Sequence, residues 1–220
     1  MRADTEVAVF DLDGTVLCCD SFRRFIWYAA RRNPKILYRG WYLLFTYLVY
    51  VLKFRNNEWL KTEFLSTIIG KASRRDIEAL GEKFVDELLP FIRSAAIERI
   101  RYHRDQGHLT ILATASLDFY VESLNEHIGC DKVVCTECEW TSSGLFAGAL
   151  AGGNCYGERK LTKVLRLLSV ERGSRLIAAY SDHLSDFPLL DAAERAYLVN
   201  PDHRTLRSRS RQEALTLNWD

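Results

Sequence analysis

Two aspartates separated by a single residue follow the first apolar run of this sequence, as Asp11-Leu12-Asp13-Gly14-Thr15. Side chains alternate between the two sides of an extended chain, so both carboxylates are expected to point the same way. Like charges that lie close together are costly unless a cation or a shared proton offsets them. An acidic loop after a strand would explain one aspartate, but not a pair followed by a turn residue and a hydroxyl. The pattern therefore predicts a divalent-metal site beside a carboxylate nucleophile.

Polar residues also follow two later apolar runs and begin one helical pattern. The apolar runs cover residues 109–113 and 176–180, and the helical pattern begins near residue 158. In an open α/β sheet, ligands bind at the carboxyl ends of the strands, so we expect these residues to converge there with the paired aspartates. Ala115 and Ser116 are expected to open a helix with free backbone N–H groups. The converging residues are Thr114, Ala115, Ser116, Lys160, Asp182 and Asp186.

The chemistry of this set fits a phosphate monoester. Such a dianion needs cationic and N–H donors, which Lys160, the Thr114 hydroxyl and nearby amides would supply. The carboxylates leave oxygens for a hard metal ion, and Mg²⁺ prefers carboxylates, waters and a substrate phosphate. The metal would also let an aspartate oxygen approach an anionic phosphorus. We therefore expect an Mg²⁺-dependent reaction on a phosphate monoester.

Apolar runs and helical patterns alternate over most of the chain. Strands are predicted at residues 7–10, 109–113, 132–140, 176–180 and 196–199. Helices are predicted at residues 92–106, 117–127, 158–168 and 186–193. This alternation is typical of an α/β fold with a Rossmann-like parallel sheet covered on both faces.

A group of helical segments separates the first strand from the others. They are predicted at residues 21–32, 36–54, 58–69 and 73–89. Ser73 and Asp76 have the spacing of a helix cap, and Pro90 ends the group. We therefore predict a catalytic core of residues 1–19 and 90–220, with a helical cap of residues 20–89 inserted into it.

The motifs resemble those of the haloacid dehalogenase-like (HAD) phosphohydrolases. The closest resemblance is to subfamily IB, which has a helical (type C1) cap after the first motif and includes the phosphoserine phosphatases. All four motifs of the family occur in order, and the resemblance covers nearly the whole chain. They are Asp11-Leu12-Asp13-Gly14-Thr15, Thr114, Lys160 and Ser181-Asp182-His183-Leu184-Ser185-Asp186.

This resemblance implies a role for each matching residue. Asp11 would be the nucleophile that forms an aspartyl-phosphate, and Asp13 would protonate the leaving alcohol and then activate water. Thr114 and Lys160 would hold the phosphoryl oxygens. The implied metal ligands are Asp11, Asp13 through its backbone carbonyl, Asp182 and Asp186, the last either ligating or orienting. The expected substrate-binding residues are Thr15, Asp20, Ala115 and Ser116.

Asp13 and Asp20 bear on which substrate this chain takes. The dehalogenases that give the family its name lack an acid at the position of Asp13, which favours a phosphatase. Asp20 follows Asp11 by nine residues, and phosphoserine phosphatases have a glutamate at that spacing for the substrate ammonium. The alternative is that Asp20 caps the helix that begins at residue 21. Those enzymes also have a Ser-Gly-Gly type of turn where this chain has Thr114-Ala115-Ser116.

The segment 21–57 contains eight basic residues and no acidic residue. Within it, residues 40–52 are apolar on every side, whereas a helix facing solvent is expected to be amphipathic. As a helix they would extend about 20 Å, short of the roughly 30 Å hydrocarbon core, so an interfacial position fits better than a span. A fully buried cap helix and a dimer interface are the alternatives.

The basic, aromatic cap is similar to that of bacterial phosphatidylglycerophosphate phosphatases of this subfamily. We therefore hypothesise a phosphatase of a phospholipid headgroup phosphate at the cytoplasmic membrane face, with segment 21–57 contacting anionic lipid. The alternatives are a soluble phosphatase of a small metabolite such as phosphoserine or another amino-alcohol or polyol phosphate, a phosphotransferase, and a scaffold without activity. The sequence leaves the oligomeric state open.

Composition places the chain among ordinary globular proteins. It has 220 residues, 48% of them hydrophobic and 27% charged, with a net charge of +1. This near-neutral balance gives no reason to expect nucleic acid as a partner. Residues 1–6 lack the apolar centre of a signal peptide, so a cytoplasmic protein is expected. Cys135 and Cys138 have metal-ligand spacing, but without a second pair they are interpreted as reduced thiols of a strand.

Overall fold

A central sheet of seven strands organises the computed structural model, which describes residues 5–32, 38–70, 72–170, 174–208 and 214–220. The strand order is β4-β3-β2-β1-β5-β6-β7. All neighbouring strands are parallel except β3 and β4, which are antiparallel. The strands are β1 (Thr5–Phe10), β2 (Leu109–Leu117), β3 (Lys132–Trp140), β4 (Phe146–Ala151), β5 (Ser174–Ser181), β6 (Arg195–Val199) and β7 (Leu215–Leu217).

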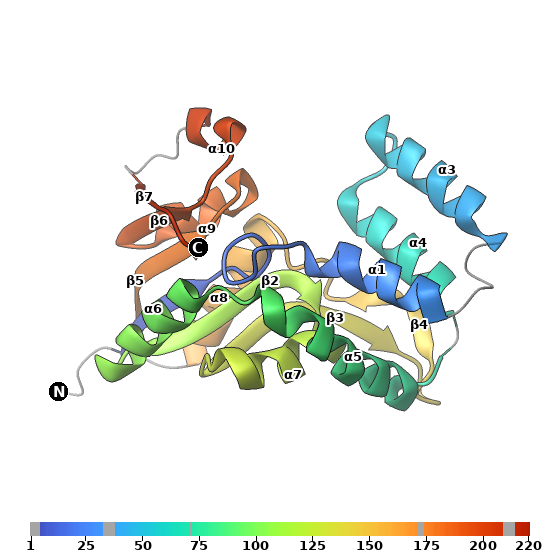
Figure 1. Ribbon diagram of the computed structural model, residues 1–220, viewed down its shortest axis with the longest axis horizontal. Helices are drawn as coiled ribbons and strands as arrows, with labels where there is room; N and C mark the ends of the chain where they lie inside the picture. Colours follow the sequence, from blue (N-terminus) through green and yellow to red (C-terminus); the bar gives the residue numbers. More distant parts are fainter. Residues whose placement is uncertain (1–4, 33–37, 71, 171–173, 209–213) are drawn as a thin grey trace.

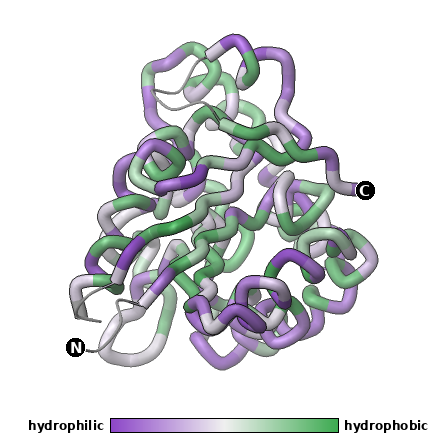
Figure 2. Tube along the Cα trace, turned by 90° about the vertical axis from the view of Figure 1, so that its left-hand side faces the viewer, coloured by the Kyte–Doolittle hydropathy of each residue, from purple (hydrophilic) through white to green (hydrophobic). Residues whose placement is uncertain are grey.

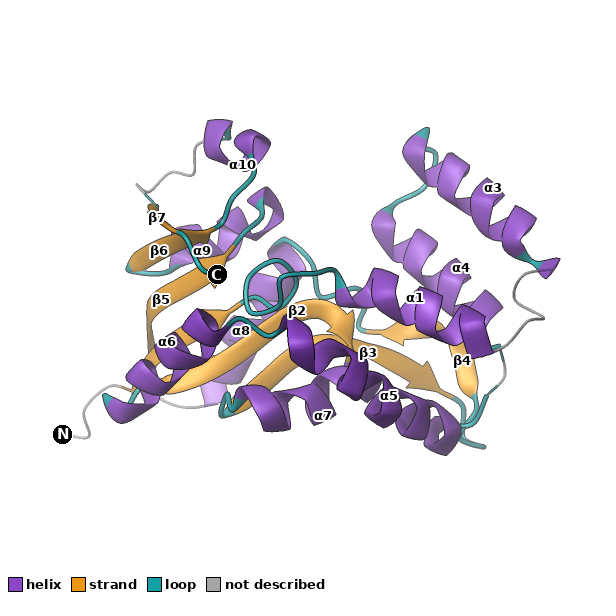
Figure 3. Cartoon of the chain, viewed as in Figure 1, coloured by secondary structure: helices purple, strands orange, loops and turns teal. Residues whose placement is uncertain are grey.

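Helices cover both faces of this sheet, which confirms the predicted α/β fold (Figure 3). The helices are α1 (Ser21–Arg32), α3 (Gly40–Val51), α4 (Asn57–Ile68), α5 (Arg74–Leu88), α6 (Ser94–Asp105), α7 (Asp118–Ile128), α8 (Glu158–Val170), α9 (Phe187–Ala192) and α10 (His203–Arg207). Two short 3-10 helices are also present: η1 (Leu89–Phe91) between α5 and α6, and η2 (Leu184–Asp186) between β5 and α9. Strands β4 and β7 and helix α10 were not predicted from the sequence.

Alternating side chains of β1 supply two separate hydrophobic cores. Ala8 and Phe10 belong to one core, together with residues of α1, α5, α6 and α7. Val7 and Val9 belong to the other, together with residues of α8 and α9. A strand buried on both faces explains why this stretch is apolar without interruption. In Figure 2 the central strands carry long hydrophobic stretches, and the surrounding helices alternate in colour.

The topology brings three strand ends together. Strand β1 lies between β2 and β5, and all three run in the same direction. The residues that follow Phe10, Ala113 and Tyr180 therefore meet at one edge of the sheet. This is the place where open α/β sheets bind ligands.

Helices α1, α3, α4 and α5 connect β1 to β2, in the segment predicted as a cap. In Figure 1, α1, α3 and α4 lie together above the part of the sheet that contains β3 and β4, and α3 is the outermost. Helix α5 packs instead on α7. The Ser73 side chain accepts a hydrogen bond from the Asp76 amide and caps α5. The division into a core of 1–19 and 90–220 and a cap of 20–89 stays a prediction.

The apolar run 40–52 forms an exposed helix. Thr46 is the one buried residue of α3, whereas Trp41 is 72% exposed and Phe45 57% exposed. A fully buried cap helix is therefore the wrong interpretation of this run. The helix over this run was predicted at residues 36–54, and residues 36 and 37 lie outside the described residues. No helix in the described ranges combines the length and apolar character needed to cross a membrane.

The turn after β2 differs from the prediction. Ala115 and Ser116 were expected to open a helix, but β2 continues to Leu117 and α7 begins at Asp118. The reason is that Leu117 pairs with Thr136 of β3 after a break in the register. The amides of residues 115 and 116 consequently belong to an irregular end of a strand, not to a helix terminus.

Close packing of α5 on α7 depends on Gly81. A Cβ atom there would lie 2.1 Å from the backbone oxygen of Phe119, far inside contact distance. We expect Gly81→Ala to lower the free energy of unfolding by about 1–3 kcal/mol, because the helices must separate. Urea unfolding would measure this loss. Gly40→Ala is the matched control, since none of the residues that the structure describes lies within 4 Å of its Cβ position. An equal loss in both variants would contradict the explanation.

Candidate active site

A buried lysine joins two carboxylates at the carboxyl ends of β1 and β5. Lys160 Nζ lies 2.6 Å from Asp11 Oδ1 and 2.6 Å from Asp186 Oδ2. The same Asp186 oxygen accepts a hydrogen bond of 2.8 Å from the Ser181 hydroxyl. Asp11 is held in place because its amide donates to the Tyr180 carbonyl at 2.9 Å. Residues far apart in the sequence thus form one charge cluster.

Asp13 lies on the other side of the same turn. Its Oδ2 accepts a hydrogen bond of 2.6 Å from the Ser116 hydroxyl, and its Oδ1 accepts one of 2.7 Å from the Ser21 amide. Gly14 makes the turn possible, because its φ of 81° is in the left-handed region. A Cβ at Gly14 would also lie 2.1 Å from Asp182 Oδ2, so glycine lets this carboxylate approach.

Burial and mutual repulsion dominate the electrostatics of the carboxylates. Burial, together with the charges of Asp186 and Asp182, raises the pKa of Asp11 well above its usual range, although Lys160 opposes the shift. Burial and the charge of Asp186 raise the pKa of Asp182 to about 7. Burial and the charge of Asp20 raise the pKa of Asp13. The site therefore favours both bound cations and protonated carboxyls.

The pKa of Lys160 shifts in the opposite direction to that of an ordinary buried lysine. Burial lowers it, but the charges of Asp11 and Asp186 and their hydrogen bonds outweigh burial, so the pKa is raised. The ammonium group is consequently fixed in its charged form beside Asp11. Such a cation can hold an anionic group that enters the site.

A pocket of about 370 Å³ opens onto this cluster. Asp20 lines it and also caps α1, because its Oδ1 accepts a hydrogen bond from the Arg23 amide. The expected substrate-binding residues Thr15 and Ser116 do not line the pocket; they contact the side chains of Asp11 and Asp13 instead. The lining residues are Asp11, Asp13, Gly14, Cys19, Asp20, Thr114, Ala115, Tyr156, Lys160, Asp182, His183, Ser185 and Asp186.

Three residues support the site without having been singled out from the sequence. The Ser21 hydroxyl forms hydrogen bonds with the Ser116 hydroxyl at 2.7 Å and with the Tyr120 hydroxyl at 3.1 Å. Tyr156 lines the pocket from the loop before α8. No local pattern could have indicated Ser21 or Tyr120, because a serine at a helix start and a tyrosine within a helix are common. Their roles depend on the packing of α1 against α7.

The fold and this site define a class of α/β enzymes in which carboxylates and a lysine act on a phosphate group. The chain belongs to the haloacid dehalogenase-like hydrolase family, whose match runs over residues 8–191. Its resemblance to the phosphoserine phosphatase group, predicted from the motifs, is confirmed. The chain is a phosphoric monoester hydrolase.

Relatives and solved structures resemble this chain over most of its length. The "inhibition of morphological differentiation protein" of Streptomyces azureus is 29% identical over 217 residues, covering 96% of this chain and 76% of the relative. A probable phosphatase of Mycobacterium tuberculosis is 27% identical over 223 residues, covering 99% and 75%. A phospho-aspartyl intermediate analogue of phosphoserine phosphatase has the same fold, with a TM-score of 0.64 at 16% identity and coverage of 93% and 90%.

Proposed function

We propose that Asp11 is the nucleophile of this phosphatase and that Asp13 is its general acid and base. The Asp11 carboxylate attacks phosphorus, the bond from phosphorus to the ester oxygen breaks, and Asp13 gives its proton to the leaving alcohol. Asp13 then takes a proton from water, whose oxygen attacks phosphorus and releases phosphate from Asp11. The observation that carries this proposal is the Lys160 ammonium placed 2.6 Å from both Asp11 and Asp186.

The raised pKa of Asp13 supports its role. Burial and the nearby charge of Asp20 favour the protonated carboxyl, which a general acid needs. The Ser116 hydroxyl and the Ser21 amide fix the orientation of this carboxyl. The Asp13 carboxyl can therefore hold a proton beside the pocket until the alcohol leaves.

The donor set also fits Mg²⁺. Asp186 Oδ1 is buried and has no hydrogen-bond partner within the described parts of the chain, and burial and Asp186 raise the pKa of Asp182 to about 7. A cation would relieve both. The described residues contain no cage of three or more His, Cys, Asp or Glu ligands, but Mg²⁺ commonly takes one or two carboxylates plus waters and substrate phosphate. We propose Asp11, Asp182, Asp186 and the Asp13 carbonyl as its ligands, and the ion would offset the negative charge of the phosphoryl group.

Thr114, Lys160 and Ala115 are proposed to hold the phosphoryl oxygens. All three line the pocket, and Lys160 keeps its positive charge there. Thr15 and Ser116 are proposed to act indirectly, through Asp11 and Asp13. Asp20 caps α1, which was one of the two interpretations of this residue, and it also lines the pocket. We propose that it contacts an amine or hydroxyl of the substrate as well.

We propose a phospholipid headgroup phosphate as the substrate, reached at the cytoplasmic face of a membrane. The support is the exposed apolar surface of α3, which we call the α3 patch. Basic residues flank it and a membrane interface would cover it. The α3 patch comprises Trp41, Leu44, Phe45, Tyr47, Leu48 and Val51. A small amine or polyol phosphate is the second candidate, supported by Asp20 in the pocket wall.

Flotation on vesicles separates these substrates. We expect the wild type to float with phosphatidylglycerol vesicles, and the double variant Trp41→Gln with Phe45→Gln to lose at least about fivefold of the bound fraction. Tyr102→Gln is the control, because Tyr102 is 53% exposed on α6, away from the patch. Activity on a panel of phosphate esters with Mg²⁺ completes the experiment. No flotation of the wild type, with full activity on water-soluble esters, would overturn the lipid proposal in favour of the small metabolite.

A further inference from the structure

Lys61 of α4 is a buried lysine that the reaction described above does not use. Lys61 is only 5% exposed. The ammonium donates to the Ala115 carbonyl at 2.5 Å and to Asn154 Oδ1 at 3.0 Å. Both acceptors are neutral oxygens. Burying an ammonium group against neutral acceptors is costly, which gives reason to ask what this contact achieves.

The Ala115 carbonyl and the Ser116 N–H belong to the same peptide group. In a trans peptide these two bonds point in opposite directions. The carbonyl is held by Lys61 and by the Thr136 hydroxyl at 2.7 Å. The N–H therefore points away from them, and it donates to Thr114 Oγ1 at 2.9 Å. A cation on the carbonyl also polarises the peptide and makes its N–H a stronger donor.

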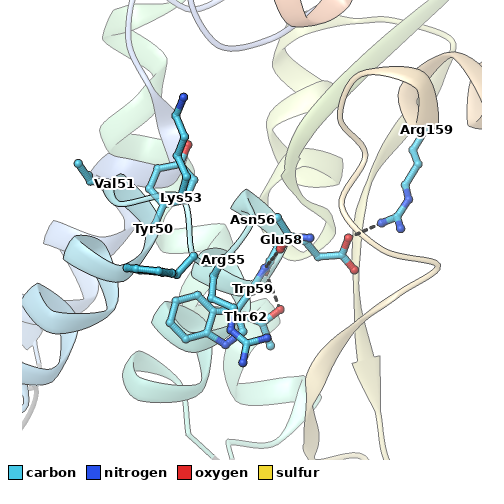
Figure 4. Close-up of a pocket in the computed structure, with 10 residues that line it drawn as sticks. Tyr50, Val51, Lys53, Arg55, Asn56, Glu58, Trp59, Thr62 and Arg159 are labelled. Atoms are coloured by element: carbon cyan, nitrogen blue, oxygen red, sulfur yellow. Dashed lines mark hydrogen bonds and ion pairs between the residues drawn. The ribbon is translucent and has the colours of Figure 1, made fainter.

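Helix α4 reaches the site by a second contact as well. Glu58 and Lys61 are three residues apart, so they lie on the same side of α4. Glu58 pairs with Arg159, which directly precedes Lys160 (Figure 4). Lys61 contacts Asn154 in the loop before α8. The same helix thus contacts both the turn after β2 and the loop that leads to Lys160.

We propose that Lys61 is a positioning residue, which fixes the Ala115–Ser116 peptide and so couples α4 to the turn that holds the phosphoryl group. This inference rests on the proposed role of Thr114 and its neighbours in phosphoryl binding. Through the buried ammonium group of Lys61, α4 takes part in the chemistry of the core.

The charge of Lys61 gives this role a pH signature. Burial lowers the pKa of Lys61 to about 8, although the charges of Asp13 and Asp20 oppose the shift. The thiols of Cys138 and Cys155 also face the ammonium group, and burial raises their pKa values, so they stay neutral near pH 8. Above pH 8 the ammonium loses its proton and its bond to the Ala115 carbonyl weakens. Activity is therefore expected to fall on the alkaline side.

Lys61→Met tests the inference, with Lys163→Met as its control. We expect Lys61→Met to lower kcat about 10- to 100-fold with little change in KM, because the turn is misaligned in the transition state. It should also lack the alkaline fall near pH 8. Lys163 likewise donates to a backbone carbonyl, that of Cys135 at 3.0 Å, and its replacement should leave kcat within about twofold. Thermal unfolding of each variant confirms that the measured protein is folded.

Asn154→Asp supplies a second, independent readout. It places a carboxylate against the Lys61 ammonium, so the alkaline fall of kcat should move up by about one pH unit or more. If the wild type is active and Lys61→Met has the same kcat, or if neither variant alters the alkaline fall, the positioning role alone is overturned. Failure of the wild type to become phosphorylated on Asp11 would instead overturn the proposed function. The two failures are therefore distinguishable.

Discussion

Replacing Asp11 by asparagine is expected to lower turnover at least about 1,000-fold and leave the protein folded. The amide has nearly the shape of the carboxylate but no anionic oxygen to attack phosphorus, so no aspartyl-phosphate can form. Lys160 keeps Asp186 as its partner in the variant. Steady-state hydrolysis of a phosphate monoester with Mg²⁺ measures the loss. Acid-quenched samples should show transient protein-bound phosphate in the wild type and none in Asp11→Asn.

The stability of Asp11→Asn has a predictable sign. The folded-state pKa of Asp11 is raised by burial, so its ionised form costs stability, and that cost grows as pH rises above the unfolded-state pKa. Without metal, the variant should therefore be at least as stable as the wild type at pH 7–8. Asp118→Asn is the control for activity only, because Asp118 accepts hydrogen bonds from the Cys138 amide outside the pocket, while burial raises its own pKa to about 6. Hydrolysis by Asp11→Asn above about 1% of wild type would refute the nucleophile assignment.

Lys160→Met is expected to have the second-largest effect, on both activity and stability. Lys160 is 3% exposed and offsets the charges of Asp11 and Asp186, which are buried with it. Its removal leaves two buried carboxylates without a cation, which costs about 3–5 kcal/mol in comparable buried pairs. We also expect kcat/KM to fall at least about 1,000-fold, because the phosphoryl oxygens lose their cationic donor.

The stability loss of Lys160→Met should depend on pH. Without the ammonium group, the pKa of Asp11 rises further, since burial and Asp186 already raise it. A carboxyl with a raised folded pKa contributes stability at low pH and loses it as pH rises. The deficit against wild type should consequently be larger at pH 8 than at pH 5, in urea unfolding with a metal chelator. Lys163→Met, on the same helix, should show no such dependence, and a deficit that does not change with pH would contradict the charge argument.

The sequence alone was sufficient to predict the fold class and most of its elements. Uninterrupted apolar runs such as that of β1 are typical of strands buried on both faces, and the alternation with helices requires a parallel sheet. Strand β3 was predicted with the bounds that the structure has, Lys132–Trp140. Predictions were weakest over the last twenty or so residues, because α10 and β7 are short and have little periodicity.

Local patterns misjudged two features whose outcome depends on distant partners. The end of β2 was expected to be a helix start, but pairing of Leu117 with Thr136 keeps it extended. The apolar run of α3 allowed a buried helix as one interpretation, whereas the structure leaves Trp41 and Phe45 exposed. Neither result follows from periodicity, because periodicity does not say which other segment lies alongside.

What the sequence determined by itself is the chemical inventory: paired carboxylates, a lysine and a hydroxyl, each directly after a predicted strand or at the start of a helix. These positions follow from short-range order along the chain, which local residue patterns record. Only the tertiary structure decided that Lys160 bridges Asp11 and Asp186, that Ser21 and Ser116 hold Asp13, and that Lys61 contacts the Ala115 carbonyl. Those contacts join residues from separate elements, and their distances are set by how helices and strands pack.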